Sequence, residues 1–216
     1  MMKLLHIDCS PKAESNSRAL SAGIVAHLLT TAPTVRVTRR DLGLQPIAHA
    51  AESYAHALSS PAALQAAERT DAVRESEALI QELELADVVV IGTPMNNFTV
   101  PSVLKAWIDQ ILRMGRSIGV SPTGHKVGLL QDKPVYIAIA SGGFFTGPNA
   151  KQPDFLTPYL QAALGCVGLH SLQFLVLQGT AFIAQDQLDA ARHALVAGFD
   201  ADKLGITAVE MPRGPA

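Results

Sequence analysis

Hydroxyl and amide side chains gather in a few loops of this chain, and these loops are where chemistry is to be sought. The first, residues 9–17, reads Cys-Ser-Pro-Lys-Ala-Glu-Ser-Asn-Ser. It precedes a segment with helical spacing of apolar residues, and the first backbone N–H groups of a helix have no partner within the helix. Such N–H groups, with the hydroxyls of Ser10, Ser15 and Ser17, would suit a phosphate. A second interpretation stays open, in which Ser15 or Ser17 only caps the helix.

Two further loops have a similar composition. Residues 93–98 read Thr-Pro-Met-Asn-Asn-Phe, and residues 141–147 read Ser-Gly-Gly-Phe-Phe-Thr-Gly. Each follows a mainly apolar run, at residues 87–92 and 135–140. Runs of this kind are typical of parallel strands that are buried on both faces of a sheet.

Strands and helices alternate along the chain. Strands are expected at residues 3–8, 34–40, 87–92, 135–140 and 172–177, and helices at 15–31, 61–85, 102–116, 155–165 and 186–199. This alternation predicts an α/β fold, a doubly wound five-stranded parallel sheet with strand order 2-1-3-4-5 and helices on both faces. Residues 44–60 are expected to form a connection with about one helical turn, and residues 117–133 a loop with a small edge element or turn. We expect one domain over residues 1–216.

The three polar loops are predicted to lie at one edge of this sheet. Ligands of open parallel sheets bind beyond the carboxyl ends of the strands, where the strand order reverses. The first loop has neither a Gly-x-Gly-x-x-Gly fingerprint nor a Walker sequence, which disfavours a dinucleotide-binding Rossmann domain and a P-loop NTPase. Its hydroxyls suit the phosphate of flavin mononucleotide (FMN), and the other two loops would then border the isoalloxazine ring.

The bulk composition narrows the class of protein. The 216 residues are 48% apolar and 17% charged with a net charge of −2, which disfavours nucleic acid or an anionic membrane as the main partner. Two cysteines cannot by themselves form a disulfide framework or a zinc site, so we expect no metal and a reducing compartment. We find no signal-peptide pattern and no apolar run of membrane-spanning length, and therefore expect a cytoplasmic protein.

Several motifs resemble, in order, those of the FMN-dependent NADH:azoreductase and quinone reductase family within the flavodoxin-like superfamily. Residues 90–98 followed by Pro101 and Leu-Lys at 104–105 are similar to its Pro-Met-Tyr-Asn-Phe segment. The remaining matches are its phosphate loop at residues 10–18, its Ser-x-Gly-Gly turn at 141–143, and its Thr-Pro-Tyr-Leu and glycine segment at 155–168.

The resemblance implies a homodimer with one FMN per subunit and active sites at the interface. NADH or NADPH would reduce the flavin, and a quinone or azo compound would then take two electrons at the same site. The implied cofactor-binding residues are Ser10, Ser15, Asn16 and Ser17 for the phosphate, and Met95, Asn96, Asn97, Phe98, Ser141, Gly142, Gly143 and Phe144 around the ring. No catalytic side chain is implied, because the flavin carries the reaction.

Two positions depart from the family pattern. Asn96 stands where the family usually has Tyr. An Arg commonly follows the serine of the turn, and here either Gly142 stands in its place or the turn is one residue shorter. Both changes bear on the substrate range and on the choice between NADH and NADPH.

Some residues of the loops have two interpretations. Asn97 either contacts the ring edge or is a turn residue that tolerates left-handed backbone. The phenylalanines at 98, 144 and 145 form a stacking or interface wall or belong to the core. Trp107 serves packing or a dimer interface.

Four further side chains are of a type that could have a role in the site. His6 is expected to be a core or edge histidine, and Cys9 a small buried residue. His125 is a candidate for substrate contact. Arg18 either assists the phosphate or is a surface charge.

A flavodoxin-type electron carrier with a protein partner is the alternative function. Such a carrier would be expected to show a strongly acidic face, against which the net charge of −2 argues. A scaffold that has lost its flavin is disfavoured, because all three serines of the first loop are present.

Overall fold

Five parallel strands form the central sheet. They are β1 (Lys3–Asp8), β2 (Arg36–Asp41), β3 (Val88–Pro94), β6 (Val135–Ala140) and β7 (Leu172–Leu177). In the computed structural model, which describes residues 1–67 and 71–199, their order is β2-β1-β3-β6-β7. The predicted topology is thus confirmed, and two strands shift by one or two residues from the expected bounds.

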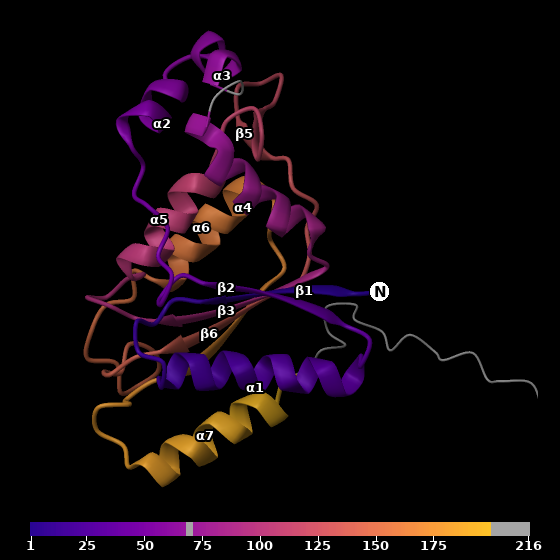
Figure 1. Cartoon of the computed structure of the whole chain (residues 1–216). Coiled ribbons are helices and arrows are strands. Elements are labelled where there is room, and N and C mark those ends of the chain that lie inside the picture. Colours follow the sequence, from indigo (N-terminus) through magenta and orange to yellow (C-terminus); the bar gives the residue numbers. More distant parts are fainter. Residues whose placement is uncertain (68–70, 200–216) are drawn as a thin grey trace, which may run out of the picture.

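Helices cover both faces of the sheet (Figure 1). α1 (Asn16–Thr31) and α7 (Gln185–Ala197) lie below it in this view, and α4 (Arg74–Leu85), α5 (Ser102–Ile111) and α6 (Thr157–Val167) lie above. Successive side chains of a strand point to opposite faces. β1 therefore places Leu4 in the core between the sheet and α1, and Leu5 and Ile7 in the core between the sheet and helices α4 to α6. Burial on both faces explains the nearly continuous apolar strands.

The single helix expected over residues 61–85 is wrong. The chain forms α3 (Pro61–Ala67), a 3-10 turn η1 (Asp71–Val73) and then α4, while residues 68–70 lie outside the described part. The preceding connection contains α2 (Glu52–Ala57). Apolar side chains of α2, α3 and η1 form a small cluster of their own, so α3 packs against α2 instead of continuing the axis of α4.

The segment after α5 also differs from the expectation. The helix predicted over residues 102–116 ends at Ile111, because the hydroxyl of Ser117 accepts the backbone N–H of Arg113 and turns the chain. The predicted loop 117–133 contains an antiparallel hairpin of β4 (Ile118–Val120) and β5 (Lys126–Gly128). A Cβ at Gly128 would lie 2.1 Å from the backbone nitrogen of Gly168, so the hairpin rests directly on the end of α6.

Trp107 of α5 is only 1% exposed and belongs to the core beneath α4 to α6. Its role within this chain is therefore packing. None of the helices in residues 1–67 and 71–199 is both long enough and apolar enough to cross a bilayer.

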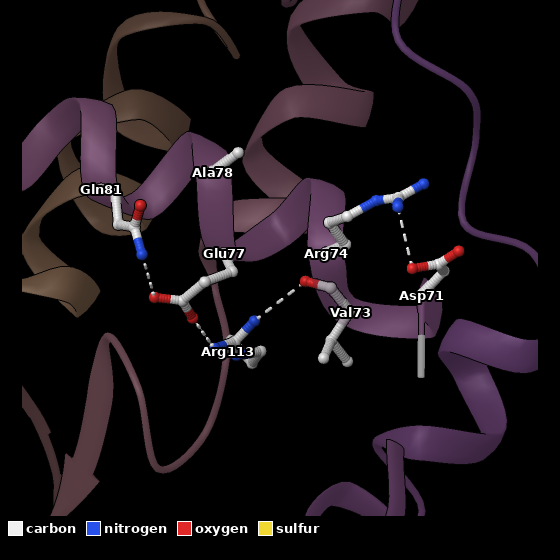
Figure 2. Close-up of a pocket in the computed structure, with 7 residues that line it drawn as sticks. All are labelled: Asp71, Val73, Arg74, Glu77, Ala78, Gln81 and Arg113. Atoms are coloured by element: carbon white, nitrogen blue, oxygen red, sulfur yellow. Dashed lines mark hydrogen bonds and ion pairs between the residues drawn. The ribbon is translucent and has the colours of Figure 1, made fainter. Parts of the chain in front are cut away.

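Two arginines hold the carboxylate of Glu77 in α4. Arg113, which is buried beyond the end of α5, and Arg116 both donate hydrogen bonds to it, and Gln81 adds another. Burial alone would raise the pKa of the Glu77 carboxyl, but these hydrogen bonds lower it from 4.5 to about 2. Figure 2 shows Glu77 between Gln81 and Arg113 in a hollow on α4, whose lining includes no residue of the three polar loops.

We predict that Glu77→Gln flattens the acid side of the stability profile. The folded-state pKa lies below the ordinary value, so ionised Glu77 stabilises the fold fully above about pH 4.5, and this contribution is lost as the pH falls to about 2. Urea unfolding followed by circular dichroism should therefore show a shallower decline for the variant over this interval. The control is Glu75→Gln, an exposed neighbour on the same helix. Identical pH profiles for the wild type and Glu77→Gln would contradict the prediction.

Candidate functional site

The three polar loops leave β1, β3 and β6, which are adjacent strands, at the same edge of the sheet. The register pairs Asp8 with Gly92 and Pro94 with Ala140, so the strands end side by side. The backbone N–H of Cys9 donates to Gly92 at 2.8 Å, which continues the pairing into the first loop. The predicted grouping of these loops is confirmed.

The first loop places its hydroxyls at the N-terminus of α1. Ser15 is the N-cap of α1 and accepts the backbone N–H of Arg18 at 3.3 Å, so Ser15 does cap the helix. The hydroxyl of Ser17, which is 1% exposed, lies 3.4 Å from that of Ser15. Each hydroxyl has one hydrogen, and only one of the two can donate to the other, so at least one of these hydroxyls keeps its donor for a ligand. Asn16 is the first residue of α1 and is half-buried between them.

Arg18 fixes the backbone of this loop. Its Nε and Nη2 donate to the carbonyl oxygen of Ser10 at 3.1 and 2.7 Å, and its Nη1 and Nη2 donate to the carboxylate of Asp41 at 2.7 and 2.5 Å. The hydrogen bonds from Arg18 lower the pKa of Asp41. Because Arg18 is 8% exposed and paired with Asp41, it is not a surface charge, and its hydrogen bonds to Ser10 hold the predicted phosphate loop in place. It is a positioning residue that sequence analysis did not recognise.

Gly43 completes this arrangement. Its backbone N–H donates to the carbonyl oxygen of Asp8 at 3.1 Å, and a Cβ on Gly43 would lie 1.9 Å from the carbonyl oxygen of Ser10. Only glycine therefore lets the turn after β2 approach the first loop so closely.

Asp8 is a buried acid at the end of β1. Ser21 donates to Asp8 at 2.9 Å and Arg39 donates at 2.8 Å, while Nε2 of His6 lies 3.0 Å from the hydroxyl of Ser21. Burial alone would raise the pKa of Asp8, but its contacts with His6, Ser21 and Arg39 hold the pKa below its usual value. His6 is thus a core histidine within a polar network, as predicted.

Cys9, next to this network, is fully buried, and burial raises the pKa of its thiol far above the ordinary range. A neutral, inaccessible thiol is a poor nucleophile, which agrees with the predicted packing role.

The second loop is a tight turn with unusual backbone. Asn96 and Thr99 exchange backbone hydrogen bonds at 2.9 and 3.0 Å. The residues between them, Asn97 and Phe98, have φ of 47° and 73°, both left-handed. Asparagine tolerates this region, whereas a bulky side chain there is uncommon. The turn is held by the backbone N–H of Phe155, which donates to the carbonyl of Phe98 at 3.1 Å.

The side chains of this second loop divide into two groups. Met95 is 9% exposed and points inward, while Phe98 is 45% exposed. Asn96 and Asn97 are exposed and line a hollow that Tyr159 borders from the neighbouring helix α6. The turn thus presents two amides and one aromatic ring at the edge of the site.

The third loop contacts the second through Ser141. The hydroxyl of Ser141 lies 3.8 Å from the sulfur of Met95, and Nε2 of Gln152 lies 3.1 Å from that hydroxyl and 3.2 Å from the same sulfur. A Cβ on Gly143 would lie 2.7 Å from Oε1 of Gln152. Gln152 therefore belongs to the site, although its sequence context, an irregular loop, carries no signal for this. Gly142 is exposed beside this contact.

Two phenylalanines of the third loop and His125 have other surroundings. Phe144 packs against the backbone of Gly179, where a Cβ would lie 2.4 Å from its ring, and Phe145 is a core residue with 6% exposure. His125 is exposed at the tip of the β4–β5 hairpin, and its backbone N–H donates to Ser121. Within this chain the structure does not bring His125 to the three loops.

The family model described as a flavodoxin-like fold matches residues 2–199. The fold and the site thus define a flavodoxin-like protein. The chain is 44% identical to FMN-dependent NADH:quinone oxidoreductase 4 of Pseudomonas fluorescens over 90% of this chain and 94% of that one, and 43% identical to oxidoreductase 5 of Burkholderia lata over 84% and 87%. The chain belongs to this family of FMN-dependent NADH:quinone oxidoreductases.

Solved structures support the fold independently. An azoreductase from Bacillus anthracis superposes with a TM-score of 0.76 at 24% identity, covering 91% of this chain and 96% of that one. An FMN-dependent NADH-azoreductase from the same species, in complex with FMN, gives a TM-score of 0.71 at 22% identity over 91% and 97%.

We expect Arg18→Met to weaken both the fold and the site. It leaves the Asp41 carboxylate without its main partner, which should lower the free energy of unfolding by about 2–4 kcal/mol. It also frees the Ser10 carbonyl, so the affinity for FMN should fall. Urea unfolding and quenching of flavin fluorescence measure the two effects. Arg36→Met, an exposed position on β2, is the control. Wild-type stability and FMN affinity in Arg18→Met would show that the pair does not hold the loop.

Proposed function

We propose that this chain binds FMN at the three loops and transfers two electrons from NAD(P)H to small aromatic acceptors. The observation that carries the proposal is the hydroxyl-lined start of α1. It follows β1, and the turns after β3 and β6 leave the next two strands of the sheet at the same end. Helix N-termini and hydroxyl donors suit a phosphate dianion, and the turns supply a polar and apolar border for a flat ring.

The residues present fit FMN. Ser10, Ser15 and Ser17 with the first N–H groups of α1 would hold the phosphate, and Asn16 lies at the same end of the helix. The ring would be bordered by residues 95–98 and 141–143. The ring of Phe144 packs against Gly179, so we propose that Phe144 shapes the third loop beside the ring site. When bound, FMN supplies hydride acceptance and donation.

The protein contributes position and hydrogen bonds to this chemistry. Backbone hydrogen bonds fix the turns after β3 and β6, and Arg18 fixes the loop after β1. The site is therefore preorganised before the ligand binds. Cys9 is inaccessible, so a thiol adduct forms no part of the proposed mechanism.

The proposed acceptors are quinones and, by reductive cleavage, aromatic azo compounds. The relatives are named quinone oxidoreductases, and the similar solved structures are named azoreductases. Asn96 in place of an aromatic residue leaves a polar rim on the second loop, and Gly142 leaves the third loop without a cation. NADH is the proposed donor by relation to the named relatives, and NADPH is to be compared with it.

We propose a homodimer with active sites at its interface. Two large apolar side chains, Phe98 with 45% and Phe155 with 58% exposure, come from segments that hydrogen-bond to each other beside the site. Exposed aromatic pairs of this kind favour an interface. Sedimentation equilibrium should give twice the 22.9 kDa mass of the chain, and Phe155→Glu should shift it toward the single-chain mass. A wild-type mass of one chain would overturn the dimer.

We also propose that residues 1–216 form a single domain that works in the cytoplasm. One sheet carries both main cores of the described residues, and Cys9 and Cys166 are free thiols, which suit a reducing compartment.

The function predicts a defined result on reconstitution. The purified chain with added FMN should bind one flavin per chain, show flavin absorbance after gel filtration, and oxidise NADH in the presence of a quinone with ping-pong kinetics. NADPH and an azo dye are tested in parallel. A chain that retains no flavin would exclude the proposal. Flavin binding without oxidation of NADH or NADPH would favour the flavodoxin-type carrier.

A serine variant separates phosphate binding from helix capping. Ser15→Ala combined with Ser17→Ala should weaken FMN binding by a few kcal/mol, about 1–3 kcal/mol for each hydrogen bond to a charged group. Riboflavin, which has no phosphate, is the matched ligand, and its affinity should change little. Equal losses for FMN and riboflavin would assign the serines to capping only.

A further inference from the structure

We infer that Gln152 is a flavin-contacting residue, whose side-chain carbonyl accepts a hydrogen bond from the N–H group on the pyrimidine portion of the isoalloxazine ring. The inference rests on the proposed function, because it places the ring between the second and third loops. It adds a residue to that site from the connection between β6 and α6, which neither the motifs nor the predicted loops include.

The position of the amide is the first support. Nε2 of Gln152 lies 3.1 Å from the hydroxyl of Ser141 and 3.2 Å from the sulfur of Met95. The side chain therefore bridges the two turns that follow β3 and β6, although it lies eleven residues beyond Ser141 along the chain. Both contacts are made by the nitrogen of the amide, which orients the group.

The carbonyl of the same amide is left as an acceptor. In residues 1–67 and 71–199, the hydrogen bonds of the Gln152 side chain come from Nε2 alone, and none reaches Oε1. An amide oxygen can accept two hydrogen bonds, and the residue is half-buried, so this acceptor is preorganised at the border of the proposed ring site. The oxidised isoalloxazine ring has a single N–H donor, at N3, which provides a matching group.

Glycine at position 143 makes room for the amide. A Cβ there would lie 2.7 Å from Oε1 of Gln152 and 3.1 Å from its side-chain carbon Cδ. Because Gly143 has no left-handed backbone that would require glycine, the close approach of Gln152 is the physical reason for the small residue. A Cβ on Gly142 beside it would meet, among the described residues, only Ala181 within 4 Å, at 3.6 Å.

A flavin analogue tests the contact without relying on turnover. FMN and 3-methyl-FMN, which lacks the N3–H donor, are titrated into the wild-type protein and into Gln152→Met, and affinity is measured by fluorescence quenching. The wild type should bind FMN about 10-fold more tightly than Gln152→Met does. In the wild type, the affinity for FMN should exceed that for 3-methyl-FMN, and this ratio should be about 10-fold smaller in Gln152→Met. The change in the ratio measures the interaction between residue 152 and the N3–H group.

Two further variants complete the experiment. Gln152→Glu keeps an acceptor and should retain discrimination against 3-methyl-FMN, whereas Gln187→Met, an exposed position on α7, should behave as the wild type. Circular dichroism of each protein without flavin checks that it is folded. If Gln152→Met does not fold, the wild-type protein still tests the inference, because equal wild-type affinities for FMN and 3-methyl-FMN would overturn it.

The outcomes separate the two proposals. Wild-type protein that binds no FMN overturns the proposed function. Wild-type protein that binds FMN, with unchanged affinity and unchanged discrimination in Gln152→Met, overturns the role of Gln152 and leaves the function standing.

Discussion

The hydrogen bonds from Arg18 to the carbonyl of Ser10 are the constraint on which the rest of the site depends. A guanidinium that is 8% exposed must be paired, and Asp41 at the end of β2 provides the charge. The pair thus joins α1, the first loop and the edge strand in one unit. Since a buried pair contributes less to net stability than its loss would cost, its main effect is to allow a single conformation of the loop.

Two ionisable groups beside the site keep one charge state near neutral pH. Asp8 remains ionised within its network, and Cys9 remains a neutral thiol. The residues proposed to hold the ligand offer hydroxyls, amides and backbone N–H groups, with the charged side chains of Lys12 and Glu14 beside them in the first loop. Such a site binds and orients, and it leaves electron transfer to the cofactor.

The sheet order and the convergence of the loops were predictable, because apolar runs on β3 and β6 can only be buried between two helix layers. The break before α4 and the β4–β5 hairpin were not, since both depend on tertiary contacts. The hairpin rests on Gly168, forty residues beyond Gly128, and no local pattern reports that contact. The burial of Arg18 in α1 was not predictable for the same reason, because its partner Asp41 lies on β2, 23 residues along the chain.

The turn at Asn97 and Phe98 has a consequence for how the protein can change. Left-handed backbone costs a residue with a side chain about 1–2 kcal/mol relative to glycine, and the cost is largest for bulky residues. Glycine at position 98 would relieve that strain and simultaneously delete an exposed aromatic ring beside the site. Selection for thermal stability alone would thus favour glycine at position 98, whereas selection for recognition of aromatic molecules would favour keeping phenylalanine. The turn is a point at which the two selective pressures are opposed.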